Sequence, residues 1–452
     1  MKHYINFSKD SYTDQIFLSY NNKNITFNDF YHNVSSKSRA LLRLNLSSHN
    51  IIGIFVSNPI DILELYFACI QINKTPIIFP YDIHSSELSK IIKKYKIDFI
   101  ITEWLQKKSI NKIKEVSFFY IQELSSSFGG CGPIEFNSLI DDTNQIQSLH
   151  LSLGSTGVSK LIKLTFDNFI NSVSQWDHEI NFSHKDRYIQ CLPLNHIAGL
   201  SIIMRSQIKG FQCILMKKFN AAQINFEIDN GATLVSLIPS MLKRLLDNRL
   251  GRAFPKHFRG VILGGDGSSK QLMKQSLDYK VPIYKSYGMT ETCSGISGFW
   301  LHKYPDMLGS VGQSFKGTSI KISDSRVLIK GPTVSIHNDD GEKSPQTILT
   351  NDIGFFKKRF LFIKGRCDDI VISGGENISL SNIKSILFQH DSIVDAYLDV
   401  NQDDLYGSRI TAFIQVSKPN VSSQDIYNYL INHLSENQCP QDIQIVDQIN
   451  HN

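Results

Sequence analysis

The feature that most constrains the fold is an alternation of short aliphatic runs with segments of helical period, which begins at about residue 50. Ile51–Val56, Thr75–Phe79 and Ile97–Thr102 are aliphatic, whereas the apolar residues near Ile60–Ile72 and Ser85–Tyr95 recur at helical spacing. Strands that alternate with amphipathic helices are typical of a parallel sheet with crossover helices. The sequence therefore predicts an α/β fold.

The alternation resumes after a polar stretch, Ser125–Pro133, and its character changes beyond about Gly309. From there the apolar runs are shorter and alternate with polar residues, which is typical of antiparallel strands. We predict a large N-terminal domain over residues 1–364, with parallel-type sheets, helices and a β subdomain. A hinge at 365–368 and a small, mobile α+β domain over 369–452 should follow. The further predicted strands are Tyr188–Leu192, Cys213–Met216, Thr233–Leu237, Val261–Leu263, Pro282–Tyr284, Ser319–Ile322, Arg326–Ile329 and Phe360–Ile363.

Composition and charge exclude several classes of protein. The 452 residues are 41% hydrophobic and 20% charged, which suits two or three folded domains. A net charge of +5 is too dilute on this chain to predict a nucleic-acid partner. No apolar run approaches the roughly 18 residues of a membrane span. The first ten residues lack the apolar region of a signal peptide, so we expect a cytoplasmic protein, and the seven cysteines have no disulfide or zinc spacing.

A Gly/Ser-rich segment, Ser152–Lys160, is the first candidate for chemistry. It follows an apolar strand and precedes a helix that should start near Thr165. Its small residues permit unusual backbone angles and expose N–H groups, and Lys160 adds a positive charge, as in a phosphate-binding loop. From this motif alone, an ordinary Gly/Ser turn is an equal alternative. The segment is not a Walker A loop, so a P-loop NTPase is not expected.

Further motifs follow in a fixed order, and together they resemble the acyl-adenylate-forming, or AMP-binding, superfamily. That superfamily includes acyl- and aryl-CoA ligases, luciferases and carrier-loading adenylation domains, and the resemblance runs over nearly the whole chain. The motifs are Leu192–Gly199, Leu263–Gly265, Tyr287–Thr292, Thr350–Asp352, Gly365–Asp369 and Ser373–Ile378.

Within the superfamily the chain resembles the o-succinylbenzoate–CoA ligases of menaquinone biosynthesis. The resemblance rests on His196–Ser201 followed by Arg205, on Ser286–Ser294 and on Ser373–Ile378. It implies an AMP-forming acid–thiol ligase that joins 2-succinylbenzoate to coenzyme A, with ATP and Mg²⁺. The last motifs are shared with 4-chlorobenzoate-type ligases, so another aromatic or acyl acid is an alternative. A carrier-protein thiol as acceptor and a non-catalytic adenylate-binding pseudoenzyme also stay open, as does a homo-oligomer.

The resemblance implies roles for individual residues on the nucleotide side. Lys160, Ser155 and Thr156, with Gly157, should bind the β- and γ-phosphates of ATP, and Thr290 should contact the α-phosphate. Glu291 should bind Mg²⁺, a cation that prefers carboxylate and phosphate oxygens. Asp352 should accept the ribose hydroxyls beside Arg366. The adenine slot should be lined by Gly264, Gly265, Tyr287 and Gly288.

On the acyl side, His196 and Gly199 should border the acid, with His196 as a substrate-binding residue and not a general base. Arg205 lies nine residues after His196, roughly 180° around an ideal helix, so helix geometry does not bring the two together. As the single cation on the aliphatic stretch Leu200–Ile208, Arg205 could pair the second carboxylate of succinylbenzoate, or it could be an exposed arginine. Asp368 should be the hinge, and Gly374 and Gly375 should line the coenzyme A tunnel.

The chain also departs from the family pattern. Asn351 stands where the family usually has glycine, and Leu153 and Ser159 are unusual in the phosphate loop. The family's terminal Gly-Lys segment has no counterpart in Val446–Asn452. We therefore expect either that the small domain is truncated or that the first half-reaction, the formation of acyl-AMP, is impaired.

Overall fold

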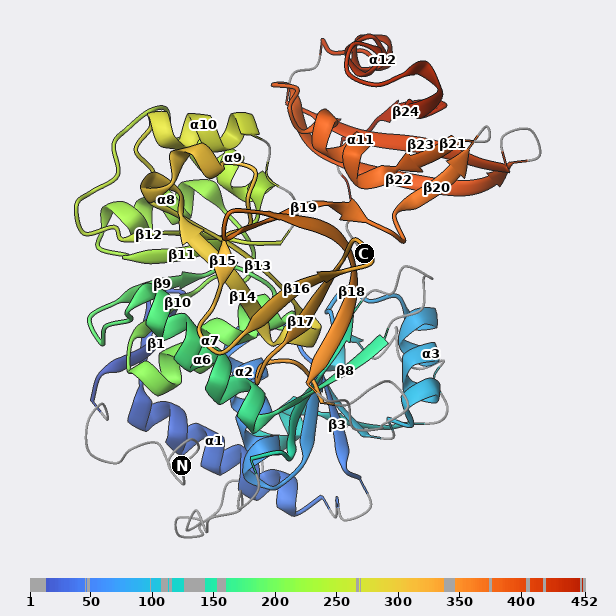
Figure 1. Ribbon diagram of the computed structural model, residues 1–452. Coiled ribbons are helices and arrows are strands. Elements are labelled where there is room, and N and C mark those ends of the chain that lie inside the picture. The colour runs from blue at the N-terminus through green and yellow to red at the C-terminus, as the bar shows by residue number, and fades with distance from the viewer. Residues whose placement is uncertain are drawn as a thin grey trace.

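The structure is a computed structural model that describes residues 14–44, 46, 49–97, 99–106, 113, 116–125, 143–152, 160–265, 268, 270–336, 346–373, 376–403, 407–417, 420–447 and 449. Within these residues the chain forms two large sheets, a smaller antiparallel sheet and a separate C-terminal unit (Figure 1). The short 3-10 helices are η2 (Trp104–Gln106), η3 (Thr290–Thr292), η4 (Leu301–Lys303), η5 (Pro305–Met307) and η6 (Glu436–Gln438).

The first sheet has the strand order β6-β5-β3-β4-β7-β8, in which only β8 runs antiparallel to its neighbour. Asn58 caps the first crossover helix by accepting a hydrogen bond from the backbone N–H of Ile60, and Pro59 occupies its first turn. The predicted alternation is confirmed here. The bounds are β3 (Ile51–Phe55), α2 (Pro59–Gln71), β4 (Thr75–Ile78), α3 (Ser85–Tyr95), β5 (Phe99–Thr102), β6 (Ser117–Tyr120), α5 (Ile121–Ser125), β7 (Ile146–Ser152) and β8 (Lys160–Thr165).

The second sheet has the order β15-β14-β13-β12-β11-β9-β10-β1-β2 and is parallel from β13 to β1. Its strands are β1 (Ile16–Tyr20), β2 (Lys23–Thr26), β9 (Arg187–Gln190), β10 (Gln212–Leu215), β11 (Leu234–Leu237), β12 (Gly260–Leu263), β13 (Ile283–Met289), β14 (Ser294–Trp300) and β15 (Gln313–Ser314). Its helices are α1 (Phe27–Leu42), α6 (Phe166–Ile180), α7 (Ile197–Lys209), α8 (Ala221–Asp229), α9 (Pro239–Arg249) and α10 (Lys270–Asp278).

One predicted strand in this sheet was too short. We expected a strand only at Pro282–Tyr284, but β13 continues to Met289 because β14 folds back antiparallel and pairs with it. The residues beyond Tyr284 are mostly small or polar, so no apolar run marks them as a strand. Long-range pairing overrides the weak local pattern at this point.

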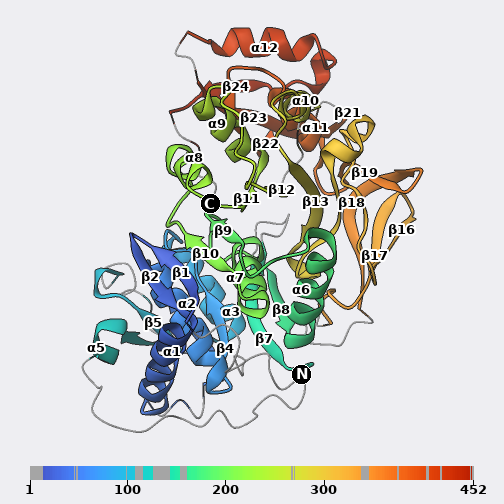
Figure 2. The ribbon, with the colours of Figure 1, turned by 90° about the vertical axis from the view of Figure 1, so that its left-hand side faces the viewer.

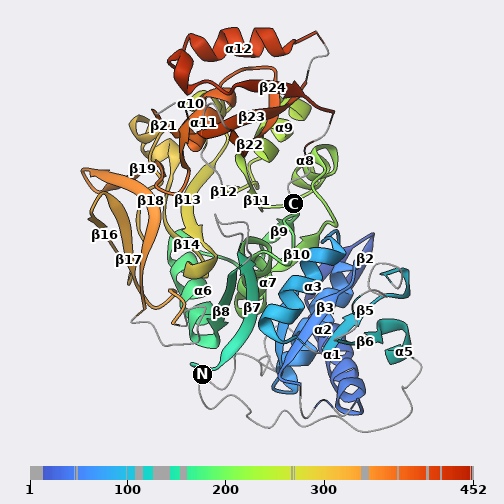
Figure 3. The ribbon, with the colours of Figure 1, turned by 90° about the vertical axis from the view of Figure 1, so that its right-hand side faces the viewer.

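A four-stranded antiparallel sheet follows, in the order β16-β17-β18-β19, and it confirms the predicted change beyond Gly309. The two rotated views place this sheet on the opposite side of the molecule from α1 and α3 (Figures 2 and 3). Its strands are β16 (Ser319–Ser323), β17 (Arg326–Lys330), β18 (Thr347–Lys357) and β19 (Phe360–Arg366).

The C-terminal unit has its own hydrophobic core, made of buried residues between Ile378 and Cys439. Figure 1 shows it set above the second sheet and joined to the rest through β19. This separate core supports the domain boundaries at 364 and 369, which stay a prediction. Its elements are β20 (Ile370–Ser373), β21 (Glu376–Ser379), α11 (Leu380–Leu387), β22 (Ile393–Asp403), β23 (Gly407–Val416), α12 (Ser423–Ile431) and β24 (Asp442–Ile445). In the described residues we find no helix with the length and hydropathy of a bilayer span.

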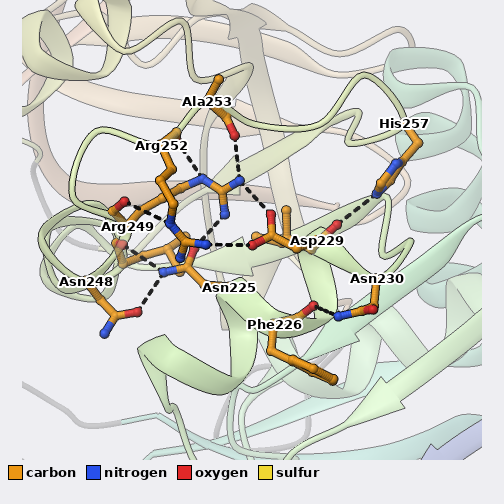
Figure 4. Close-up of polar contacts among 11 residues, drawn as sticks. Asn225, Phe226, Asp229, Asn230, Asn248, Arg249, Arg252, Ala253 and His257 are labelled. Atoms are coloured by element: carbon orange, nitrogen blue, oxygen red, sulfur yellow. Dashed lines mark hydrogen bonds and ion pairs between the residues drawn. The ribbon is translucent and has the colours of Figure 1, made fainter.

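A buried arginine, Arg249, joins α8 to the end of α9. Arg249 is 2% exposed and donates hydrogen bonds to Asp229 at 2.7 Å, to Asn225 at 3.1 Å and to the carbonyl of Ala253 at 2.6 Å (Figure 4). Its guanidinium also stacks over Phe254, 4.3 Å from the ring centroid. Because the bond to Asn225 is buried and the other two are partly buried, the cluster should stabilise the packing of α9.

We expect Arg249→Met to lower the free energy of unfolding by about 2 to 4 kcal/mol, since it leaves the buried Asn225 amide oxygen without this donor and removes the ion pair with the partly exposed Asp229. Arg252 is the matched control because it contacts the same Asp229 at 3.3 Å but is 61% exposed in its side chain. Arg252→Met should cost less than about 1 kcal/mol. Urea denaturation of the parent and the two variants measures both losses of stability. Equal losses would mean that the burial of Arg249 does not add to the stability of this cluster.

Candidate active site

A cavity of about 620 Å³ lies where the loops that follow the parallel strands β9, β11, β12 and β13 converge. Because parallel strands end at the same edge of a sheet, their C-terminal loops meet there although they are far apart in sequence. Three of the sequence motifs contribute to its walls, at His196, at Gly264 and Gly265, and at Thr290. The C-terminal unit completes the lining with Lys384, Phe388, Val394 and Asp395.

The glycines after β12 bring bare backbone to the cavity. Gly265 has φ of +89°, a left-handed conformation that favours glycine, and a side chain there would meet Ile238 at 2.9 Å. Gly264 and Gly288 also line the cavity. This backbone leaves room for a flat group to approach closely, as the predicted adenine slot requires.

Tyr287, Asp352 and Arg366 lie together, and Tyr287 stands between the cavity-lining residues Ser286 and Gly288; their assignment to the nucleotide stays a prediction. Asp352 and Arg366 are cross-strand partners on β18 and β19, and the Tyr287 hydroxyl donates a hydrogen bond to the buried Asp352 carboxylate. Burial, followed by the charge of Asp352, raises the pKa of Tyr287, so its hydroxyl stays protonated as a donor. Arg366 lies 3.5 Å from Asp352 and donates to both oxygens of Asp368, at 2.9 and 2.7 Å.

Glu291 lies on η3, which directly follows β13. Burial raises the pKa of its carboxyl, and the positive charges of Lys160 and Arg366 act in the opposite direction. Lys160 is exposed as the first residue of β8. The structure therefore brings Lys160, Glu291 and Arg366 within electrostatic reach of one another. Ser155, Thr156 and Gly157 lie outside the described residues, and so do Gly374 and Gly375.

Arg205 is buried, which excludes the alternative of an exposed arginine. It is 2% exposed and borders the cavity, because α7 is buried on nearly all its faces instead of one. Its guanidinium donates a hydrogen bond to the Ser294 hydroxyl at 2.7 Å and lies 4.3 Å from the Trp176 ring centroid. Burial lowers the pKa of Arg205 to about 10. Its Nε is buried and has no hydrogen-bond partner within the described part of the chain.

His196 and Arg205 border the same cavity despite their opposite positions on an ideal helix, because His196 precedes α7 as its N-cap residue. Partial desolvation at the cavity lowers the pKa of His196, and the charge of Asp82 opposes this shift. Gly199 lies in the first turn of α7 and is buried, and a side chain there would meet the Pro193 carbonyl at 2.3 Å. Close packing therefore accounts for this glycine, and its assignment to substrate binding stays a prediction.

Sequence reasoning missed Trp176 and Ser294, which complete the surroundings of Arg205. Trp176 comes from α6, about 30 residues before Arg205, and only the packing of α6 against α7 and β14 brings it there. Ser294 directly follows the predicted Tyr287–Thr292 motif and Cys293, and its φ of +104° is rare for a residue other than glycine. A backbone angle of this kind cannot be read from residue types.

A buried histidine, His150, lies in the same region. His150 on β7 is 3% exposed, and its Nε2 lies 2.8 Å from the Ser148 hydroxyl. Burial lowers the pKa of His150 to about 4, opposed by a hydrogen bond with the backbone of Asn195, next to His196. The ring is therefore neutral in the folded protein at physiological pH.

We expect His150 to make stability depend on pH. In the unfolded chain its pKa is about 6.5, so between pH 6.5 and 4 the unfolded state binds more protons and stability falls as the pH falls. The loss should reach about 3 kcal/mol at pH 4, relative to a His150→Gln variant in which all other groups still titrate. Urea unfolding of both proteins across this range tests it, and parallel stability curves would contradict it.

Magnesium fits the carboxylate side of the site. Glu291 faces Lys160 and Arg366, and Mg²⁺ commonly binds through one or two carboxylates plus substrate phosphates. The described residues contain no cluster of three or more His, Cys, Asp or Glu side chains that would hold a metal alone. A single carboxylate such as that of Glu291 suits a cation that arrives with a nucleotide.

Comparison with known proteins identifies the family. The model of the AMP-binding enzyme family matches residues 7–334. A 2-succinylbenzoate–CoA ligase of Oceanobacillus iheyensis is 27% identical over 446 residues, which cover 95% of this chain and 92% of that protein. The fold is also that of the o-succinylbenzoate CoA synthetase of Bacillus subtilis. Its complex with the acyl-adenylate intermediate OSB-AMP superimposes with a TM-score of 0.85 at 24% identity, covering 99% of this chain and 95% of that one. The complex of the same synthetase with ATP and magnesium superimposes with a TM-score of 0.85 at 23% identity, covering 99% of this chain and 96% of that one. The family match spans most of the chain, and the chain belongs to the AMP-binding enzyme family.

Proposed function

We propose that the protein is an ATP-dependent, AMP-forming ligase that joins 2-succinylbenzoate to coenzyme A. The observation that carries the proposal is that one cavity borders both the Gly264–Gly265 loop and the buried guanidinium of Arg205. This arrangement suits an acid with two carboxylates. One carboxylate would react with the nucleotide beside the glycine loop, and the other would bind the buried guanidinium. The relatives named 2-succinylbenzoate–CoA ligase support this choice of acid.

The reaction has two halves. In the first, the acid carboxylate attacks the α-phosphate of ATP, which forms acyl-AMP and releases pyrophosphate. In the second, the thiol sulfur of coenzyme A attacks the acyl carbon and AMP leaves as the thioester forms. Such chemistry depends mainly on positioning and on stabilising charge at the phosphates.

We assign the nucleotide to the residues that meet beside the cavity. Asp352 accepts the ribose hydroxyls, oriented by Tyr287 and Arg366. Thr290 faces the α-phosphate, and Lys160 neutralises the outer phosphates. Glu291 holds Mg²⁺, which when bound screens the negative charge of the phosphates.

We assign the second carboxylate of the acid to Arg205. Its unpartnered Nε and its bond to Ser294 leave a buried positive charge that one anionic group would neutralise. His196 borders the acid at the other end of α7. A cytoplasmic location is proposed because both ATP and coenzyme A are drawn from that compartment.

Isotope exchange between pyrophosphate and ATP over a panel of acids tests the proposal. We expect exchange with 2-succinylbenzoate to exceed that with benzoate, and coenzyme A to convert the adenylate to a thioester. Exchange with another acid alone would redirect the substrate assignment. No exchange with any acid would overturn the enzymatic function in favour of adenylate binding.

A further inference from the structure

We propose that Lys243 and Asn351 form a two-point clamp that holds the C-terminal unit over the cavity. Lys243 acts at the interface between the two parts of the chain and Asn351 acts at the connection between them. Both are positioning residues. The catalytic consequence rests on the proposed function, whereas the clamp itself can be measured without any substrate.

Lys243 bridges from the large part of the chain to the C-terminal unit. It lies on α9, and its ammonium donates hydrogen bonds to the carbonyls of Asp391 at 3.0 Å and Ile393 at 3.1 Å. These carbonyls stand at the start of β22, and the next two residues, Val394 and Asp395, line the cavity. Figure 2 shows α9 beside β22, as their contacts require. Lys243 therefore sets where this edge of the C-terminal unit meets the cavity.

Asn351 forms hydrogen bonds to the segment that connects the large part of the chain to the C-terminal unit, at Asp368. Its amide oxygen accepts a hydrogen bond from Arg326 on β17 at 2.8 Å, and its amide nitrogen donates to the Asp368 carboxylate at 2.9 Å. The same carboxylate accepts the two bonds from Arg366, and the Cys367 backbone N–H donates to the Asn351 carbonyl at 2.7 Å. Asp368 is thus held from both sides.

The amide is the group that this position requires. Glycine has no side chain to bridge Arg326 and Asp368. Aspartate could accept from Arg326 but would place a second negative charge against Asp368. Asparagine alone of these three accepts on one side and donates on the other.

Rotation of the C-terminal unit must break these contacts. The Lys243 bonds join residues on opposite sides of the connection, and turning the backbone at Asp368 moves its carboxylate away from Asn351. Hydrogen bonds that involve a charged group each correspond to about a tenfold or larger change in an equilibrium. Lys243 bonds to Asp391 and Ile393, whereas Asn351 bonds to Arg326 and Asp368, so the effects of the two anchors should multiply.

The test measures the distance between the two parts of the full-length chain. Dyes are attached through genetically encoded amino acids at positions 226 on α8 and 431 on α12, where Phe226 is 63% and Ile431 42% exposed. Single-molecule energy transfer without ligand should show one dominant distance for the parent. Lys243→Met and Asn351→Gly should each raise the population of other distances about tenfold, and the double variant about 100-fold.

Matched variants distinguish a specific effect on the position of the C-terminal unit from a general loss of stability. Arg244 is the neighbour of Lys243 but lies over the Phe219 ring, 4.9 Å from its centroid, within the large part of the chain. Arg244→Met should leave the distance between the two dyes unchanged. Lys243→Arg should also keep the parent distance, because arginine retains a charged hydrogen-bond donor. Unchanged distances in Lys243→Met, Asn351→Gly and the double variant, with parent-like unfolding midpoints, would overturn the proposal.

The half-reactions give a second readout. Loss of the clamp should change the ratio of adenylation to thioester formation from supplied acyl-AMP by about tenfold. A purely structural role would lower both rates equally, and that result would also overturn the clamp. If no acid is adenylated, the proposed function fails, but the distance measurement still decides the clamp.

Discussion

Glu291→Gln and Lys160→Ala should each slow the formation of acyl-AMP by about 100- to 1,000-fold, the effect of removing one preorganised electrostatic group from a transition state. Glu291 lies on η3 next to the cavity-lining Thr290, and Lys160, the first residue of β8, interacts electrostatically with Glu291. Neither side chain belongs to a hydrophobic core, so the fold should survive both changes. Pyrophosphate–ATP exchange at saturating acid measures the loss.

Lys163→Ala is the control for Lys160. It lies on the same strand three residues later, where its side chain points to the opposite face. Its exchange rate should stay within about twofold of the parent, because it adds no charge at the phosphates. If Glu291→Gln and Lys160→Ala also stay within twofold, the phosphate site lies elsewhere.

Arg205→Gln should lower the use of 2-succinylbenzoate by about 10- to 100-fold, the scale of one lost charge-assisted hydrogen bond. Benzoate lacks the second carboxylate, so its much weaker reaction should change little. The ratio of kcat/KM for the two acids is the measurement, because any loss of folded protein cancels in it.

Arg205→Lys is the conservative comparison. It keeps the positive charge but loses the planar fork and the stacking on Trp176, and it should recover only part of the selectivity. Equal losses for both acids in Arg205→Gln would instead mean that Arg205 supports the packing of α6, α7 and β14 without contacting the acid.

The α/β fold class was predictable because hydrophobic period is a local property. Short aliphatic runs such as Ile51–Val56, bounded by segments of helical period, favour buried strands between helices, and the structure confirms that alternation. The family was predictable for a related reason. Motifs such as Tyr287–Thr292 are continuous in sequence, so their resemblance can be read directly. The identity of the phosphate, ribose and metal residues stays a prediction that rests on those motifs.

The sequence by itself determined which loops carry polar and glycine residues, because residue types and their spacing are present in the chain before it folds. Only the tertiary structure decided which side chains share the cavity. The burial of Arg205 between Trp176 and Ser294 depends on helix packing, and β13 extends to Met289 only because β14 pairs with it. The contacts of Lys243 with residues 391 and 393 span about 150 positions. Such pairings arise from chain topology, and no local pattern of residues encodes them.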